Sequence, residues 1–188
     1  MPPLRAWVAM LVIALGACAS TPPSAPERSY AGRFSAMAVS ADRRDSVSGR
    51  FLIEIRGQQQ LIELATPVGT TLARIEIEPG HAKVTDGKLL GFSGPDADEL
   101  VEQALGWRLP VAGLSHWLDG RPDPARDASV SRDGEHISEI RQDGWIIRIT
   151  EVSVPGQKPR RIQFDRAATA VEPGVSVRLL IDSPDQSP

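Results

Sequence analysis

Alternating apolar and polar residues constrain this chain more than any other feature. Within residues 47–55, Val47, Phe51, Ile53 and Ile55 share one parity, and Leu52 is the apolar exception on the other. Successive side chains of a β-strand point to opposite faces, so this period of two predicts a half-buried strand. Comparable runs occupy 60–66, 71–78, 135–142, 145–153, 160–164 and 175–181, with the turn dipeptides Pro79-Gly80, Asp86-Gly87 and Asp133-Gly134 among them. Closely spaced strands joined by tight turns favour an antiparallel sheet.

The middle of the sequence has a helical pattern instead. Pro95 is followed at once by acidic residues, which suit the positive end of a helix dipole. Apolar residues then recur at helical spacing over 100–105, and Gly106 can end this helix. A second short helix is expected over 111–118. Strands, then two helices, then strands predict one mainly β (α+β) domain over residues 30–182.

The sheet of this domain is expected to be single, antiparallel and strongly curved, with the helices over its concave face. A closed small barrel and a flat sheet covered by helices also fit, because periodicity does not report curvature. The last residues, 183–188, are predicted to be a disordered tail.

The N-terminus is typical of an exported lipoprotein. Residues 1–17 carry one basic residue and then an apolar run of roughly 12 residues, the length of a signal-peptide core and too short to span a bilayer. The run ends in Leu15-Gly16-Ala17-Cys18, which resembles a lipobox, and Cys18 is the only cysteine in the chain. We therefore expect N-acyl and S-diacylglycerol groups on Cys18 and a flexible, Pro-rich tether over 18–29. Position 19 is Ala rather than the Asp that resembles an inner-membrane retention signal, so the expected location is the periplasmic face of an outer membrane.

Composition and motifs argue against several classes of function. The net charge of −3 and the lack of a sizeable basic cluster outside Arg160-Arg161 disfavour binding to nucleic acid. His81, His116 and His136 are scattered without metal-ligand spacing, so no metal site is expected. No nucleophile elbow or phosphate-binding loop is present, so the chain is predicted not to be an enzyme and to need no cofactor.

Six short motifs resemble the LolB family of outer-membrane lipoproteins, which receive other lipoproteins from a soluble periplasmic carrier. Their order and spacing match across roughly residues 30–182. The motifs are Gly32-Arg33-Phe34, Gly49-Arg50-Phe51, Thr66-Pro67-Val68-Gly69-Thr70, residues 105–111, residues 114–120 and Gln142-Asp143-Gly144-Trp145.

The resemblance implies an open half-barrel whose helices form a lid over an apolar cavity. It also implies a membrane-insertion loop at Pro67, Val68 and Gly69, in which Val68 replaces the Leu that is common in the family. The implied partners of this monomer are a LolA-like periplasmic lipoprotein carrier, lipoprotein acyl chains and outer-membrane lipid. Some family members end in a tryptophan-bearing strand, and this chain departs from them at its C-terminus.

The inward-facing parity supplies the candidates for lining the cavity. They are Phe34, Phe51, Ile53, Ile62, Leu64, Ile75, Leu114, Trp117, Trp145, Ile147, Ile149 and Phe164. The same residues would also fill a solid core. The sequence therefore leaves open a lipid-binding transfer receptor, a structural or assembly-factor lipoprotein with a protein-binding surface, and a tethered hydrolase.

Overall fold

The structure, a computed structural model, describes residues 25–88, 90–153 and 158–182. The predicted signal peptide (1–17), Cys18 and the tail (183–188) lie outside these residues, as does most of the predicted tether. The elements are β1 (Arg28–Val39), β2 (Arg44–Arg56), β3 (Gln59–Ala65), β4 (Thr71–Glu78), β5 (His81–Asp86), β6 (Gly91–Gly94), α2 (Ala97–Leu105), α3 (Leu114–Trp117), β7 (Ala128–Asp133), β8 (His136–Gln142), β9 (Trp145–Val152), β10 (Pro159–Arg166) and β11 (Gly174–Ile181). The first strand thus begins two residues before the expected domain boundary.

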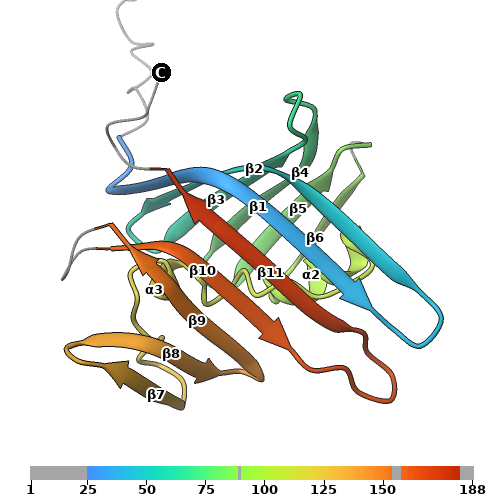
Figure 1. Cartoon of the computed structure of the whole chain (residues 1–188). Coiled ribbons are helices and arrows are strands. Elements are labelled where there is room, and N and C mark those ends of the chain that lie inside the picture. Colours follow the sequence, from blue (N-terminus) through green and yellow to red (C-terminus); the bar gives the residue numbers. More distant parts are fainter. Residues whose placement is uncertain (1–24, 89, 154–157, 183–188) are drawn as a thin grey trace, which may run out of the picture.

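All the strands belong to one antiparallel sheet in the order β6-β5-β4-β3-β2-β1-β11-β10-β9-β8-β7. The first and last strands of the chain pair near the middle, from Gly32 opposite Ile181 to Val39 opposite Gly174. Each half of the chain then winds outward by hairpins, and the helices lie between the two edge strands in the sequence (Figure 1). Because β6 and β7 are unpaired edges, the sheet is open. The prediction of a mainly β fold with one open antiparallel sheet is confirmed.

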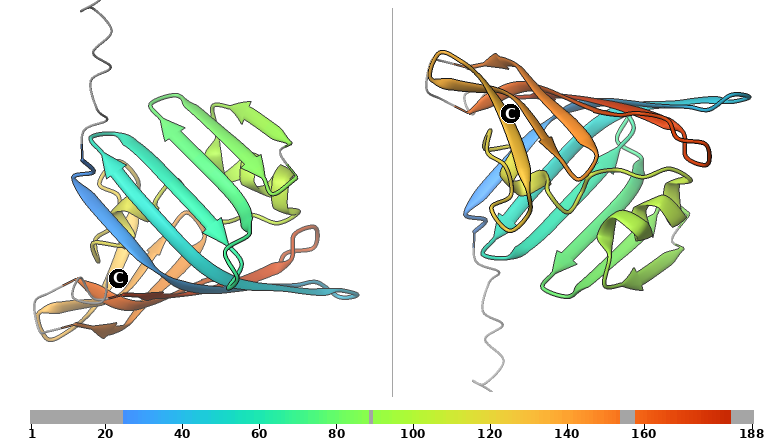
Figure 2. Two further views of the ribbon diagram at one scale, coloured as in Figure 1. Left: turned by 90° about the horizontal axis from the view of Figure 1, so that it is seen from above. Right: turned by 90° about the horizontal axis from the view of Figure 1, so that it is seen from below.

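A reciprocal pairing of glycine and phenylalanine explains the repeated Gly-Arg-Phe motif. Gly32 on β1 faces Phe51 on β2, and Phe34 on β1 faces Gly49 on β2. A Cβ at Gly49 would lie 1.9 Å from the Ala65 carbonyl oxygen, and one at Gly32 would be almost as close to a backbone oxygen of β11. Only glycine permits these close backbone approaches, and each aromatic ring covers the glycine opposite. The two rings are thereby held on the concave face of the sheet, whose curvature is visible from above and from below in Figure 2.

The longer helix starts within the predicted acidic segment and ends at the predicted Gly106. The Asp96 side chain accepts hydrogen bonds from the backbone N–H groups of Asp98 and Glu99, and Gly106 ends the helix with φ of 84°. Helix α2 packs against β4, β5 and β6. The second helix is shorter than the expected 111–118, because α3 contains a single turn. The chain between the helices, residues 106–113, crosses the concave side of the sheet (Figure 2).

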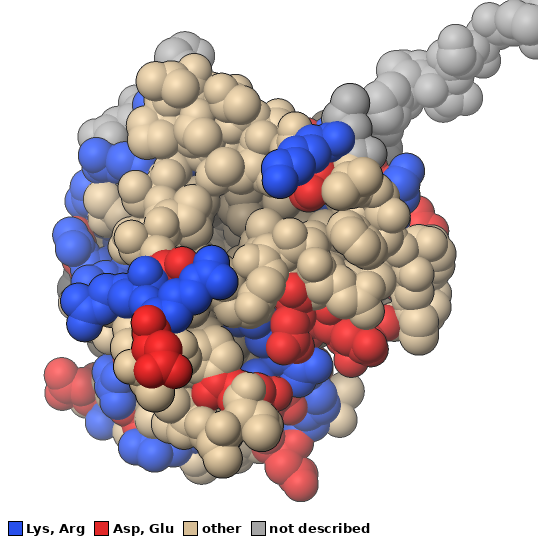
Figure 3. Space-filling model, turned by 90° about the vertical axis from the view of Figure 1, so that its right-hand side faces the viewer, with Lys and Arg blue, Asp and Glu red and all other residues tan. Residues whose placement is uncertain are grey.

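Five turns lie at the same end of the sheet, which we call the rim end: 40–43, 66–70, 87–90, 143–144 and 167–173. The register fixes this arrangement, since Ala38 faces Val175, Arg50 faces Ala65, Ala73 faces Asp86 and Asp165 faces Ile146. Strands β1 and β2 extend beyond β3 at this end, since Ala65, the last residue of β3, faces Arg50 of β2 (Figures 1 and 2). Figure 3 looks onto this side of the molecule.

Candidate apolar binding site

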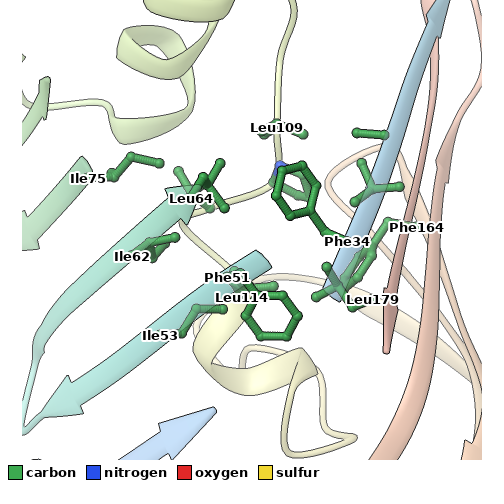
Figure 4. Close-up of a pocket in the computed structure, with 14 residues that line it drawn as sticks. Phe34, Phe51, Ile53, Ile62, Leu64, Ile75, Leu109, Leu114, Phe164 and Leu179 are labelled. Atoms are coloured by element: carbon green, nitrogen blue, oxygen red, sulfur yellow. The ribbon is translucent and has the colours of Figure 1, made fainter. Parts of the chain in front are cut away.

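An apolar pocket lies between the concave face of the sheet and the chain segment that follows α2 (Figure 4). Its volume is about 50 Å³. Every side chain that lines it is apolar: Phe34, Ala36, Phe51, Ile53, Ile62, Leu64, Ile75, Leu109, Pro110, Val111, Leu114, Phe164, Val177 and Leu179. The sheet supplies one wall through the inward parity of its strands, and residues 109–114 supply the other. Such a lining can hold hydrocarbon but offers no side-chain hydrogen bond or charge to a polar ligand.

The predicted lining residues divide into two groups. Those from β1 to β4, together with Leu114 and Phe164, line the pocket. Trp117, Trp145 and Ile147 are buried in solid packing, and Ile149 is half-buried. These four do not line the pocket, because Trp117 belongs to α3 and the other three lie on β9, beside it. The centroids of the Trp117 and Phe164 rings are 6.0 Å apart.

The sequence prediction missed several lining residues. Val177 and Leu179 share one parity of β11 with Val175 and Ile181, so this parity could have identified them. Ala36 is inward-facing on β1 but too small to stand out. Residues 109–111 belong to no strand or helix and could not be found from periodicity.

The segment that covers the pocket, residues 106–113, is attached first to the N-terminus of α2. The Ala112 backbone N–H donates to Asp98 Oδ1 at 2.9 Å. Burial raises the pKa of Asp98, although the hydrogen bond from Ala112 opposes that shift. The bond therefore connects the N-terminus of α2 to the middle of the covering segment.

A buried glutamine side chain, that of Gln142, makes the second attachment, to α3 and the chain that follows it. Gln142 Oε1 accepts hydrogen bonds from Trp117 Nε1 and the Asp123 backbone N–H, both at 2.9 Å. Its Nε2 donates to the carbonyl oxygens of Asp123 and Arg126. All the polar atoms of this amide are thus satisfied by the chain that follows α3, which fixes α3 against β8.

Asp119 forms the third attachment, next to the start of β1. Its carboxylate pairs with Arg28, Arg121 and Lys158, and it accepts a hydrogen bond from the Tyr30 hydroxyl. Burial alone would raise the pKa of Asp119, but the Tyr30 hydrogen bond and the surrounding cations lower it below its usual value. The chain end nearest the predicted tether is thereby linked to the end of α3.

The predicted insertion loop is a compact turn with an outward apolar side chain. Val68 is 89% exposed. The Gly69 N–H donates to the Thr66 carbonyl oxygen, and the Thr70 N–H donates to Thr66 Oγ1. Gly69 has φ of 91°, a conformation that favours glycine. The sequence Pro-Val-Gly therefore presents Val68 to solvent on a hydrogen-bonded turn.

The described ranges lack two features that other functions would require. Within residues 25–88, 90–153 and 158–182, no group of three His, Cys, Asp or Glu side chains is arranged to hold a metal ion. No helix in the same ranges has both the length and the apolar character needed to span a membrane.

Comparison with known proteins identifies the class and then the family. A family model described as "Outer membrane lipoprotein LolB" matches residues 27–183. The chain is 37% identical over 190 residues to the outer-membrane lipoprotein LolB of Cupriavidus pinatubonensis, covering 93% of this chain and 90% of that protein. It is 35% identical to that of Bordetella petrii, covering 96% and 94% of the two chains, and 32% identical to that of Thiobacillus denitrificans, covering 97% and 98%.

The open sheet and these relatives place the protein in the class of outer-membrane lipoproteins that serve protein transport. The chain belongs to the LolB family, which is a lipoprotein localisation factor rather than a class of enzyme.

Proposed function

We propose that this protein accepts lipoproteins from a soluble periplasmic carrier, holds their acyl chains in the apolar pocket and inserts them into the outer membrane. The observation that carries the proposal is a pocket with a wholly apolar lining, covered by a segment that belongs to no strand. Membership of the LolB family supports the same direction of transport.

Hydrophobic free energy provides the driving force. Exposing a long acyl chain to water costs on the order of 10 kcal/mol, at about 0.8 kcal/mol for each methylene. A lipoprotein therefore moves between apolar environments rather than through water. The receptor takes the chain from the carrier when its pocket binds the chain more tightly, and the bilayer then takes it because lipid is the better solvent. Each step runs downhill without a nucleotide.

The pocket has to widen before it can hold an acyl chain. A volume of about 50 Å³ accommodates roughly four water-sized groups, at about 10–15 Å³ each. The covering segment is the part that moves, because it lies outside the hydrogen-bonded sheet and is held by the separate contacts of Asp98, Gln142 and Asp119. Breaking the bond between Asp98 and Ala112 frees Leu109 to Val111 while α3 stays attached to Gln142.

The lipid on Cys18 keeps the receptor at the outer membrane. One chain anchors a protein only marginally, whereas several chains together anchor it stably. The tether lets the domain approach the bilayer, and Val68 with Pro67 and Gly69 then dips into the lipid during release. The receptor acts as a monomer in this scheme.

The small volume also favours a second candidate, a lipoprotein with a solid core that serves an assembly complex through its outer surface. Site-specific photocrosslinking separates the two. A benzoylphenylalanine at Leu64, which lines the pocket, is compared with one at Leu52, which is also half-buried but faces the opposite side of the sheet.

The receptor proposal predicts crosslinks from position 64 to the labelled acyl chains of a lipoprotein delivered by its carrier, and none from position 52. If position 64 gives no acyl crosslinks while the delivered lipoprotein still reaches the membrane, the pocket is not the binding site. Crosslinks to protein from position 52 alone would favour the solid-core alternative.

A further inference from the structure

The exposed apolar side chains are concentrated at one end of the molecule. In the described residues, the large apolar side chains that are exposed are Val68 (89%), Leu90 (57%), Val130 (42%) and Val171 (91%). Val68, Leu90 and Val171 lie on three different turns of the rim end, 66–70, 87–90 and 167–173. Val130 is on the edge strand β7 instead.

The turns at the opposite end of the sheet carry no comparable residue among those described. Those described in full are Gly57-Gln58 between β2 and β3, Pro79-Gly80 between β4 and β5, and Gly134-Glu135 between β7 and β8; of the β9–β10 connection only residues 153 and 158 are described. Scattered single apolar residues are normal on a protein surface. Three exposed apolar residues on separate turns at one end, against none among the described residues of the turns at the other, make a directional surface.

The three apolar turns are built in the same way. A short polar side chain at the start of each turn accepts a hydrogen bond from a backbone N–H group near the exposed residue. The donor and acceptor pairs are Thr70 to Thr66 Oγ1 at 3.0 Å, Leu90 to Asp86 Oδ1 at 2.9 Å and Val171 to Thr169 Oγ1 at 3.3 Å. Backbone groups satisfied within the turn do not have to be stripped of water when the turn enters an apolar medium. This construction lowers the cost of inserting the tips at Val68 and Val171, where the acceptor is an uncharged hydroxyl, whereas the acceptor beside Leu90 is the Asp86 carboxylate, which has to stay at the level of the lipid headgroups.

Two of the three tips carry no charged side chain. Residues 66–70 and 167–171 contain none, whereas the turn 87–90 contains Lys88 and follows directly on Asp86. Glu172, which follows Val171, is paired with Arg166 at 2.6 Å. The remaining turns of the rim end carry Asp42, Arg43 and Asp143, so the charges surround the apolar tips. Broad areas without basic or acidic side chains occupy the upper part of the face in Figure 3, interrupted near the top right by basic and acidic side chains. A lysine beside an apolar tip suits the headgroup region of a bilayer.

We propose that Leu90 and Val171 act with Val68 as a three-point surface that contacts the outer-membrane lipid. This inference rests on the proposed function for Val68 and adds two contacts that fix the orientation of the domain. A single inserted tip would leave the domain free to rotate about it. Three tips on separate turns set one face against the bilayer. The turn 66–70 is level with Phe34, which lines the pocket, so the pocket lies directly behind this face.

The tether is long enough for this orientation, although β1 starts at the far end of the sheet. The nine residues from 19 to 27 span up to about 30 Å when extended, at 3.3–3.6 Å per residue. From Arg28 to Arg33, the level of the turn 66–70, the strand covers only about 17 Å. The tip at Val171 extends further, so β1 lies obliquely to the bilayer when all three tips touch it.

Cysteine labelling tests the surface directly in the full-length lipidated protein. Because Cys18 is the only native cysteine and is expected to be acylated, a single introduced cysteine is the only free thiol. An environment-sensitive fluorophore is attached at V68C, L90C or V171C, and at Q58C as the control on the opposite end. Each protein is reconstituted in phosphatidylethanolamine–phosphatidylglycerol vesicles, with and without nitroxide-labelled lipid, and is compared with the same protein in detergent-free buffer containing no vesicles.

The proposal predicts a blue shift and nitroxide quenching at positions 68, 90 and 171, with neither at 58. A response at 68 alone would overturn the three-point surface and leave the proposed function intact. Equal responses at all four positions would show that the domain has no fixed orientation. If labels at 90 and 171 stay in water but L90E and V171E reduce lipoprotein uptake from the carrier, these residues dock a protein and the membrane assignment is wrong. Failure of wild-type lipoprotein transfer would instead count against the proposed function.

Discussion

The length of the side chain at position 68 should set the rate at which cargo is released into the membrane. Val68 is 89% exposed on a turn whose bonds involve only the backbone and Thr66, so its replacement removes no packing from the fold. V68L adds one methylene, which contributes about 0.8 kcal/mol on burial in lipid. That corresponds to a roughly fourfold faster release, since a tenfold change requires about 1.4 kcal/mol. V68E loses the apolar side chain, worth at least about 1.5 kcal/mol, and adds a charge, so release should slow more than tenfold.

The assay is a single-turnover transfer of labelled lipoprotein from a preformed receptor complex to vesicles. Loading of the receptor, measured separately, should be the same for both variants and the wild type, because Val68 does not line the pocket. The free energy of unfolding should also stay within about 0.5 kcal/mol of wild type. Equal release rates for Val, Leu and Glu at this position, with normal loading, would refute the role given to the loop.

Three further predictions concern the fold and the covering segment. G49A should lower the free energy of unfolding by about 2 kcal/mol or more, because its Cβ would meet the Ala65 carbonyl oxygen. G94A is the control and should lower it little, because the nearest neighbour of the new Cβ is a Leu100 side-chain atom at 3.6 Å. Chemical denaturation measures both values. D98A should speed exchange of the Ala112 amide hydrogen and acyl-probe entry, because it leaves that N–H without its acceptor at a cost of about 1–3 kcal/mol. D98N retains an acceptor and should do neither, and a D98A protein with wild-type exchange would contradict the attachment. Because the pKa of Asp119 is lowered in the folded state, its stabilising effect is complete above the unfolded pKa of about 3.9 and is lost as the pH falls through the folded value. The difference in unfolding free energy between wild type and D119N should therefore be constant from about pH 5 to 7 and shrink below pH 4, and a difference independent of pH would contradict this.

The strong alternating segments of the sequence were sufficient to predict the central strands. Residues 47–55, 60–66 and 71–78 carry large apolar residues on one parity, and they form β2, β3 and β4. The longer helix was equally predictable, because acidic residues follow Pro95 at its start and Gly106 follows the last apolar residue of the helical pattern. In these segments local chemistry and tertiary packing favour the same structure.

The edge strands were missed because they bury little. All six residues of β7 are exposed, so no apolar parity marks it, and β6 has four residues and a single large apolar side chain. Strand β5 buries only Ala82 and Val84. These strands form because a neighbouring strand offers unpaired backbone groups, which is a tertiary effect.

Only part of the candidate site could be predicted, because tertiary contacts determine the rest. Sheet residues such as Phe51 and Ile62 followed from parity, but parity alone does not distinguish the pocket from the packed region beneath α3, where Trp145 and Ile147 lie. That division depends on where the irregular segment from 106 to 113 crosses the sheet. No pattern in the sequence specifies that path.

The proposed transfer depends on binding of an acyl chain in the pocket, which calorimetric titration of the protein with a long-chain acyl ligand at several temperatures measures. Saturable binding of one chain per protein is expected, with a negative heat-capacity change, as apolar burial requires. The same ligand should fail to bind once a lipoprotein has been loaded. Absence of saturable binding by a folded protein, or binding that loading leaves unchanged, would contradict the proposed transfer.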